Sequence, residues 1–127
     1  VGVMRNAEAL NQGLTKIHAL RTELYTTGIA LTNRSFNMAW HEWLNLESLI
    51  ETSEVICLSA LARDNSRGAH FREDFPEAGD LNSSFFTTAH HSQDTYVINR
   101  RPVEFSRVKP GESLLDSKNA LPEEVIS

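Results

Sequence analysis

The sequence is poor in the residues that mark secreted, membrane-spanning and nucleotide-binding proteins. Its only cysteine is Cys57, so no internal disulfide can form, which is typical of a reducing compartment. No apolar run approaches the ~20 residues that span a bilayer, and no charged-then-apolar leader opens the chain. No Gly-x-Gly-x-x-Gly turn follows a strand, which excludes the phosphate cradle of dinucleotide-binding folds. We therefore expect a cytoplasmic chain without direct membrane insertion.

Positive charge is also scarce. The chain has 12 Lys and Arg residues against 17 Asp and Glu residues, for a net charge of −5. Because phosphate binding relies on clustered Lys and Arg, we expect no nucleic-acid partner. With 127 residues, 40% of them hydrophobic, the chain has the size of a single domain over residues 1–127. It begins with Val1 rather than Met, and we expect it to be a piece of a longer protein.

Two helices can be predicted from the spacing of apolar residues. The first follows Asn6, a favourable N-cap with Glu8 in the first turn, and ends at Gly28. Its apolar stripe has the three-and-four spacing of one buried face and consists of Ala7, Leu10, Leu14, Ile17, Leu20 and Leu24. The second helix is expected from near Asn37 to about Arg63. Its residues 55–62 are apolar on every side, which predicts packing on several sides.

The remainder of the chain predicts loops and two strands. Residues 64–82 are polar and contain Gly68, Pro76 and Gly79, so we expect a loop there. Residues 84–89 and 95–103 are rich in β-forming residues and are expected to pair around residues 91–94, with Pro102 at a strand end. The predicted fold is mainly α: a spectrin-repeat-like bundle of two to three helices (1–63), a motif loop (64–82), a short β-hairpin (83–108) and an irregular tail (109–127).

The densest group of functional side chains lies in residues 66–76, Ser-Arg-Gly-Ala-His-Phe-Arg-Glu-Asp-Phe-Pro. A guanidinium group is suited to bind carboxylates or backbone carbonyls at a domain junction. This segment, called the motif below, is therefore expected to form a domain interface, and its candidate residues are Arg67, His70, Arg72 and Asp74. A locally salt-bridged loop is the alternative interpretation.

Other titratable residues give weaker signals. His90 and His91 are adjacent, so on a strand they point to opposite faces, and no third metal ligand has suitable spacing. His18 and His41 are isolated, and Cys57 lies in an apolar stretch where a thiol is usually inert. We assign no catalytic residue, no cofactor-binding residue and no metal ligand. A small basic group is interpreted as a solvated strand end or a contact for an acidic partner: Arg100, Arg101, Arg107 and Lys109.

The order of these features resembles the C-terminal domain of the succinate dehydrogenase and fumarate reductase flavoprotein subunits. The resemblance covers residues 1–20, residues 37–76 with Ser-Arg-Gly-Ala-His-x-Arg-x-Asp, and residues 96–103. L-aspartate oxidase and adenylylsulfate reductase flavoproteins are similar here, but the Glu-Asp-Phe-Pro at residues 73–76 favours the succinate and fumarate branch. Where relatives often have Glu before Ser-Arg-Gly, this chain has Asn65, which removes one possible partner for an arginine.

The resemblance implies a parent protein that transfers a hydride between FAD and a dicarboxylate and passes electrons to an iron–sulfur subunit. The flavin and dicarboxylate sites would lie upstream of the matched region, so the isolated chain is expected neither to bind FAD nor to oxidise succinate. It would brace the flavin-binding domain of the same polypeptide, within a complex peripheral to the inner face of a membrane. The alternatives are the C-terminal domain of an L-aspartate oxidase and a stand-alone helical protein-interaction module.

Two further expectations concern assembly. Arg67→Ala in the parent is expected to loosen the domain interface and lower flavin retention, while leaving the melting temperature of the isolated domain nearly unchanged. Members of the family usually place another helix before the segment that matches residues 1–6, completing a three-helix bundle. Without it, an apolar stripe of the helices would be exposed, so we expect a homodimer, or an exchange of helices between copies, through the helices rather than the strands.

Overall fold

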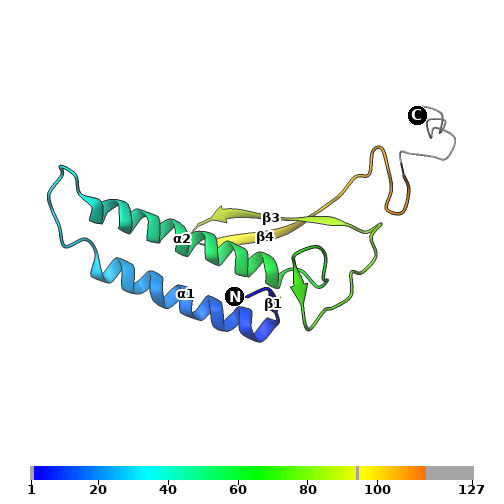
Figure 1. Cartoon of the computed structure of the whole chain (residues 1–127), viewed down its shortest axis with the longest axis horizontal. Helices are drawn as coiled ribbons and strands as arrows, with labels where there is room; N and C mark the ends of the chain where they lie inside the picture. The colour runs from blue at the N-terminus through cyan, green and yellow to red at the C-terminus, as the bar shows by residue number, and fades with distance from the viewer. Residues whose placement is uncertain (1, 94, 114–127) are drawn as a thin grey trace, which may run out of the picture.

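The computed structural model describes residues 2–93 and 95–113. They form two long helices and four strands, which lie along the chain in the order β1 (Met4–Arg5), α1 (Ala7–Thr27), α2 (Met38–Leu61), β2 (Phe71–Arg72), β3 (Phe85–Ser92) and β4 (Thr95–Pro102). Figure 1 shows the helices side by side, the β3–β4 hairpin running along α2, and the 28–37 connection at the end of the molecule remote from β1 and β2.

The boundaries of α1 follow from its capping residues, as the sequence predicts. The side chain of Asn6 accepts a hydrogen bond from Ala9 N at 2.8 Å and so satisfies one of the free amides of the first turn. At the other end, Gly28 adopts φ 62° and ψ −151°, and its amide donates to Leu24 O at 3.0 Å. A side chain at this φ and ψ would be strained, so the glycine ends the helix.

Helix α2 begins after Asn37, whose side chain accepts from Trp40 N at 3.3 Å. It packs antiparallel to α1 around a small core of Leu10, Leu14, Cys57 and Ala60. In the middle of the pair, the buried Glu54 accepts hydrogen bonds from His18 and Arg21. Burial raises the pKa of the Glu54 carboxyl, but the bonds from Arg21 and His18 outweigh it and leave the pKa below its ordinary value. Glu54 is therefore a paired buried charge.

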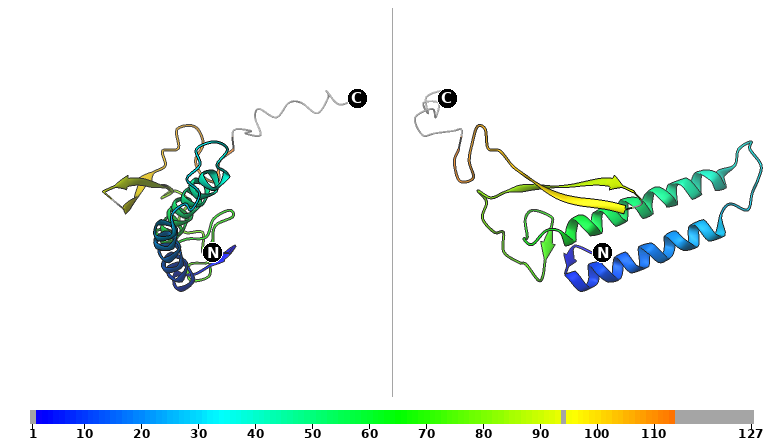
Figure 2. Two further views of the ribbon diagram at one scale, coloured as in Figure 1. Left: turned by 90° about the vertical axis from the view of Figure 1, so that its left-hand side faces the viewer. Right: turned by 180° about the vertical axis from the view of Figure 1, so that it is seen from behind.

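The hairpin of β3 and β4 is antiparallel, with Phe85 opposite Pro102 at one end and Ser92 opposite Thr95 at the other. It contacts α2 on the side away from α1, as the two further views of the ribbon make clear (Figure 2). The connection is shorter than predicted, because His91 and Ser92 belong to β3 rather than to the turn. Pro102 stands at the end of its strand, as expected.

A second, very small sheet corrects the prediction of an unbroken loop over residues 64–82. Residues 71–72 form β2, which pairs in parallel with β1 so that Met4 lies opposite Phe71 and Arg5 opposite Arg72. The pairing brings the start of the chain against the motif, and the whole helix pair is the crossover between the two strands. Residues 109–113 of the predicted tail include a turn at Lys109 and Glu112, while residues 114–127 lie outside the described residues.

The predicted bundle is present only as a helical hairpin, since the described residues contain two helices. One side of the pair is covered by the β-hairpin. Between the two helices runs an open groove, called the helix groove, with two hollows of 360 Å³ and 280 Å³. Apolar side chains from both helices line it, namely Ile17, Leu20, Leu24, Leu46, Ile50 and Ile56.

The helix groove corrects the expectation that residues 55–62 pack on all sides. Cys57 is 2% exposed, but Ile56 next to it remains 50% exposed because it faces the open groove. Despite these apolar residues, neither helix in the described part of the chain combines the length and the apolar character needed to cross a membrane.

Gly28→Ala tests the C-cap. The substitution is expected to destabilise the chain by about 1–3 kcal/mol, because φ 62° with ψ −151° is essentially restricted to glycine. Gly2→Ala is the matched control, since Gly2 has no positive φ and an added Cβ would meet only Met4 O at 4.0 Å. Urea unfolding of both variants measures the effect; equal stabilities would show that Gly28 does not set the helix end.

Candidate functional site at the helix ends

The motif is organised around Arg72, which is 1% exposed. Its Nη1 group donates to the carbonyl oxygens of Ala60 at 2.8 Å, Leu61 at 3.4 Å and Arg63 at 3.1 Å. These are the carbonyls that a helix C-terminus leaves without intrahelical partners, and a cation also suits the negative end of the helix dipole. Arg72 therefore caps α2 from strand β2, ten residues beyond the C-cap residue Ala62.

The other edge of the same guanidinium group binds Asp74. Nε donates to Oδ1 and Nη2 to Oδ2, both at 2.6 Å, which is the bidentate geometry of a strong ion pair. Asp74 Oδ2 also accepts from Ala7 N at 2.9 Å, in the first turn of α1. The Arg72 guanidinium and the Ala7 amide hold the pKa of the Asp74 carboxyl far below its ordinary value. One ion pair thus joins the end of α2 to the beginning of α1.

Residues 5 and 6 strengthen this junction. Asn6 caps α1 with its oxygen while its Nδ2 donates to Glu73 Oε2 at 2.7 Å. The amide of Glu73 donates to Arg5 O at 2.7 Å, next to the pairing of β1 with β2. Sequence analysis did not assign a role in the motif to Arg5 or Asn6, because nothing in the local pattern shows that residues almost seventy positions apart meet.

Ser66 fixes the path of the motif from inside. Its Oγ accepts from Arg72 N at 2.8 Å and donates to Phe75 O at 2.7 Å, and its amide donates to Glu77 O at 2.9 Å. Gly68, with φ 56°, makes the tight turn that lets Arg67 and His70 exchange two backbone hydrogen bonds. A serine and a glycine at these positions are therefore explained by backbone geometry.

Arg67 is half-buried and binds the segment that leads into β3. Its three hydrogen bonds go to Ala78 O at 2.6 Å, Asp80 O at 2.8 Å and Ser84 Oγ at 2.8 Å. All of them lie within the described part of this chain. The expectation of an unchanged melting temperature in Arg67→Ala is therefore revised, because this variant loses three bonds that fix residues 78–84.

His70 is held by Arg5, whose Nη1 lies 3.0 Å from His70 Nδ1. Because an arginine only donates, Nδ1 must accept, which places the proton of the neutral ring on Nε2. That nitrogen is buried without a hydrogen-bond partner among the described residues. Burial, followed by the nearby charges of Arg63, Arg5 and Arg72, lowers the pKa of His70. His70 is therefore held neutral in a cationic environment.

The β-hairpin completes the cap of α2. Arg100 Nη2 donates to Ala62 O at 2.6 Å and forms an ion pair with Asp64 at 3.3 Å. Its guanidinium also lies over the Phe85 ring, 4.5 Å from the centroid. Thus Arg100, expected to be a solvated strand end or a partner contact, has a structural role. The buried Asn65 accepts a hydrogen bond from Arg63 at 3.2 Å.

The remaining titratable residues lie apart from the motif. His91 stacks edge-on against Tyr96, while His90 contacts Asn99 on the other strand. Burial raises the pKa of the Cys57 thiol, which favours its unreactive protonated form. Among residues 2–93 and 95–113, no group of three or more His, Cys, Asp and Glu side chains is placed to hold a metal ion.

These side-chain contacts hold the motif rigidly against the two helix ends. Its polar side chains form hydrogen bonds with the helix ends and with the backbone of the motif itself. Four exposed apolar side chains lie in the motif and in the segment paired with it, and are called the motif rim: Val3 and Met4, which are 74% and 63% exposed, and Phe71 and Phe75, which are 36% and 43% exposed. A rigid segment with an exposed apolar rim is suited to contact another protein surface.

Arg72→Ala is expected to destabilise the chain by about 3–5 kcal/mol, because it leaves Asp74 and three helix-end carbonyls without their partner. Arg100→Ala, whose side chain is 49% exposed, is the control and is expected to cost about 1 kcal/mol or less. Asp74→Asn keeps an acceptor for Arg72 and should fall between them. Urea unfolding orders the three variants; a loss for Arg72→Ala no larger than for Arg100→Ala would contradict the assignment.

Because of His70, we expect the folded chain to lose stability in mild acid. The pKa of His70 is lowered on folding, so below its ordinary value of 6.5 the unfolded chain binds a proton that the folded chain does not. The free energy of unfolding should therefore decline as the pH falls from about 7 to about 5.5. His70→Gln is expected to flatten this decline, whereas His41→Gln, at an exposed position, should leave it unchanged. Identical slopes in the two variants would rule out His70 as the cause.

Comparison with known proteins agrees with this architecture. The family model described as the fumarate reductase flavoprotein C-terminus matches residues 1–114. The fumarate reductase flavoprotein subunit of Mycobacterium tuberculosis is 33% identical over 112 residues, which are 87% of this chain and 19% of that protein. The succinate dehydrogenase flavoprotein subunit of Coxiella burnetii is 40% identical over 81 residues, which are 64% of this chain and 14% of that protein.

A solved structure shows the same fold. The FrdA chain of a mutant of E. coli quinol fumarate reductase superposes with a TM-score of 0.79 at 27% identity, covering 87% of this chain and 20% of that one. L-aspartate oxidase 1 of Ralstonia nicotianae is a weaker relative, 36% identical over 77 residues, which are 61% of this chain and 13% of that protein. The chain thus spans about a fifth of the first relative's length. It belongs to the C-terminal domain family of the succinate dehydrogenase and fumarate reductase flavoproteins.

Proposed function

We propose that this chain is the C-terminal domain of an FAD-dependent oxidoreductase that interconverts succinate and fumarate, and that it braces the flavin-binding domain. The observation that carries the proposal is the family match over residues 1–114, together with relatives that are named as fumarate reductase and succinate dehydrogenase flavoprotein subunits. The chemistry would belong to the parent: a dicarboxylate would give a hydride to FAD and release a proton as its double bond forms, and an iron–sulfur subunit would receive the two electrons.

Among the described residues, the N-termini of the two helices do not fit the phosphates of the flavin cofactor. A helix N-terminus can bind a phosphate only if its first amides are free. Here the Asn6 side chain and the Asp74 carboxylate already accept from amides at the start of α1, and Asn37 occupies the start of α2. We therefore assign FAD to the parent and derive no catalytic step for this chain. Its part would be mechanical, within a complex held peripherally at a membrane.

The bracing contact would be the motif rim. Arg72 and Asp74 hold the two helix ends together, so that Met4 and Phe71 are presented on paired strands rather than on a free loop. A preorganised surface loses little conformational freedom on contact and therefore binds more tightly than a flexible one of the same composition. The interface candidates would then act indirectly, since Arg67, His70 and Arg72 position the rim.

There are two alternatives to this proposal, another parent flavoprotein and a stand-alone module. The match to an L-aspartate oxidase favours the same domain on a flavoprotein that acts on an amino-dicarboxylate. A stand-alone helical interaction module would need no flavin domain. Reading the gene in frame upstream of Val1 distinguishes the module from both flavoproteins, and assays of the full-length protein with succinate and L-aspartate distinguish the two parents.

Substitution of the motif rim tests the bracing role. In the full-length flavoprotein, Val3→Ser combined with Met4→Ser is expected to lower the flavin retained after gel filtration, because both side chains are exposed here and would lose an apolar contact there. The melting temperature of the 127-residue chain should stay unchanged. Val97→Ser, on the β-hairpin, is the control. Full flavin retention in the double variant would contradict bracing by this surface.

Arg67→Ala separates the local role of the motif from its effect on the parent. Because Arg67 holds residues 78–84 through three hydrogen bonds, we expect the isolated chain to lose about 1–3 kcal/mol of stability. In the parent, flavin retention should fall as well. Calorimetry of the isolated chain and flavin absorbance of the parent are the measurements. Flavin loss with no change in the isolated chain would restore a direct interface role for this arginine.

For the free chain, we propose that the helix groove of one copy packs on that of a second copy. The groove exposes Leu20, Leu46 and Ile56, which are 51%, 45% and 50% exposed, along one side of the helix pair. Burial of such a stripe contributes about 25 cal/mol per Å². Light scattering across a dilution series should show a dimer that Ile56→Gln dissociates and that Phe86→Gln, at an equally exposed hairpin position, does not. A monomer at high concentration would contradict this.

A further inference from the structure

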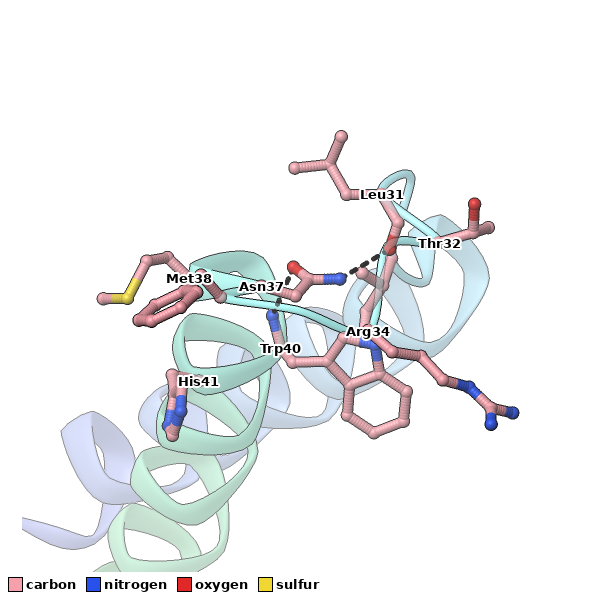
Figure 3. Close-up of a pocket in the computed structure, with 9 residues that line it drawn as sticks. Leu31, Thr32, Arg34, Asn37, Met38, Trp40 and His41 are labelled. Carbon is pink, nitrogen blue, oxygen red and sulfur yellow. Dashed lines mark hydrogen bonds between the residues drawn. The ribbon is translucent and has the colours of Figure 1, made fainter.

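The connection between α1 and α2 is an exposed apolar surface that neither the motif nor the helix groove includes. Residues 28–41, called the hairpin tip, present four large apolar side chains: Leu31, Phe36, Met38 and Trp40, which are 60%, 102%, 65% and 51% exposed. A hollow of about 680 Å³ lies among them. Figure 3 shows Leu31 and Met38 pointing away from the loop, with Trp40 and His41 on the first turn of α2.

The hairpin tip is held in one conformation by its own hydrogen bonds. Asn37 Nδ2 donates to Leu31 O at 2.8 Å and to Asn33 O at 2.7 Å, while its Oδ1 caps α2. Asn33 Oδ1 accepts from Ser35 N at 3.0 Å. Asn37 therefore ties the loop to the start of α2, as the dashed lines in Figure 3 show. An exposed apolar surface that is fixed in this way has little entropy left to lose on binding.

Phe36 adopts a strained backbone conformation, in which its carbonyl oxygen accepts from Met38 N at 3.1 Å. Its backbone angle φ is 52°, which is unfavourable for residues other than glycine, asparagine and aspartate. Strain of this kind persists where surrounding structure imposes it and is concentrated at binding surfaces. Here the result is a phenyl ring that is fully exposed. The ring itself is not buried by any residue that the structure describes, so a contact outside the described residues is a natural explanation of its exposure.

The charge of the hairpin tip defines the partner. The chain carries 17 acidic residues, yet none of them lies in residues 28–41, where Arg34 is the only permanently charged side chain. Arg34 is exposed and has no hydrogen bond or ion pair with any residue that the structure describes. An apolar surface beside an unpaired guanidinium group is complementary to an apolar side chain beside a carboxylate.

A protein segment fits this surface better than a lipid bilayer does. Binding at an anionic membrane draws on several Lys and Arg residues, each adding attraction, whereas the hairpin tip has one arginine and the chain a net charge of −5. The hairpin tip also lies at the end of the molecule remote from β1, β2 and the motif (Figure 1), so a contact here would be separate from the motif rim.

We propose that the hairpin tip is a docking surface for a protein segment that presents an aliphatic or aromatic side chain next to a carboxylate. Phe36 and Trp40 provide the apolar contact, and Arg34 pairs with the carboxylate. The surface does not depend on the flavoprotein function proposed above, since it concerns a different end of the domain.

NMR titration of the 127-residue chain tests the proposal. The probes are two synthetic peptides, acetyl-Asp-Leu-Phe-Leu-amide and acetyl-Asn-Leu-Phe-Leu-amide, which differ only in the carboxylate. We expect amide shifts confined to residues 28–41, with binding near about 1 mM and about threefold tighter for the acidic peptide, the size of effect of an exposed ion pair.

Three variants assign the contacts. Phe36→Gly should abolish binding of both peptides without destabilising the fold, because glycine accepts the positive φ. Arg34→Gln should remove the preference for the acidic peptide, and Arg107→Gln, an exposed arginine elsewhere, should not. Equal affinity for the two peptides, shifts in the helix groove instead of the hairpin tip, or no shifts at all would overturn the proposal. The proposal would also be overturned if vesicles of equal parts phosphatidylglycerol and phosphatidylcholine shifted the amide signals of the hairpin tip and the peptides did not.

Discussion

The structure depends on the ion pair between Arg72 and Asp74, because it satisfies two helix ends at once. The C-terminus of α2 leaves carbonyl groups unpaired, and the N-terminus of α1 leaves amides unpaired, so the two ends carry opposite partial charges. Arg72 binds the first set and Asp74 binds the amide of Ala7, while the two side chains neutralise each other. Because the guanidinium is almost fully buried, losing either partner would leave a charge in an environment that cannot solvate it.

This junction gives the domain one rigid end and leaves its other surfaces for contacts. Near the junction, the parallel pairing of β1 with β2 holds Met4 and Phe71 of the motif rim in place. Along the helices, the groove beside Leu20 and Ile56 has no covering element among the described residues. At the far end, Asn37 fixes a loop that exposes Phe36. The charged groups of the motif are engaged in the architecture of the domain, so the bracing role proposed above would rest on the surfaces that the domain positions.

Local features of the sequence were sufficient to predict the main elements. Asn6, Gly28 and Asn37 act within one helical turn of their own positions, so the limits of α1 and the start of α2 could be read directly. The motif was recognised as important, but the partners of Arg72 were not, because they are set by where the loop returns after α2. The two-residue strands β1 and β2 are too short for any periodicity. The two helices were predicted, but the packing of α2 on several sides was not confirmed, because exposed apolar residues on α2 resemble buried ones in sequence.

Native-state hydrogen exchange is the most direct test of the junction. The amide of Ala7 donates to Asp74 in the first turn of α1, and the amide of Ala62 lies at the capped end of α2. Helix ends normally fray independently at low free energy. If the Arg72–Asp74 pair joins them, both amides should exchange with the same opening free energy and the same dependence on denaturant. Exchange of Ala7 by independent local fraying, with Ala62 still protected, would show that the two helix ends are not coupled and would contradict this account.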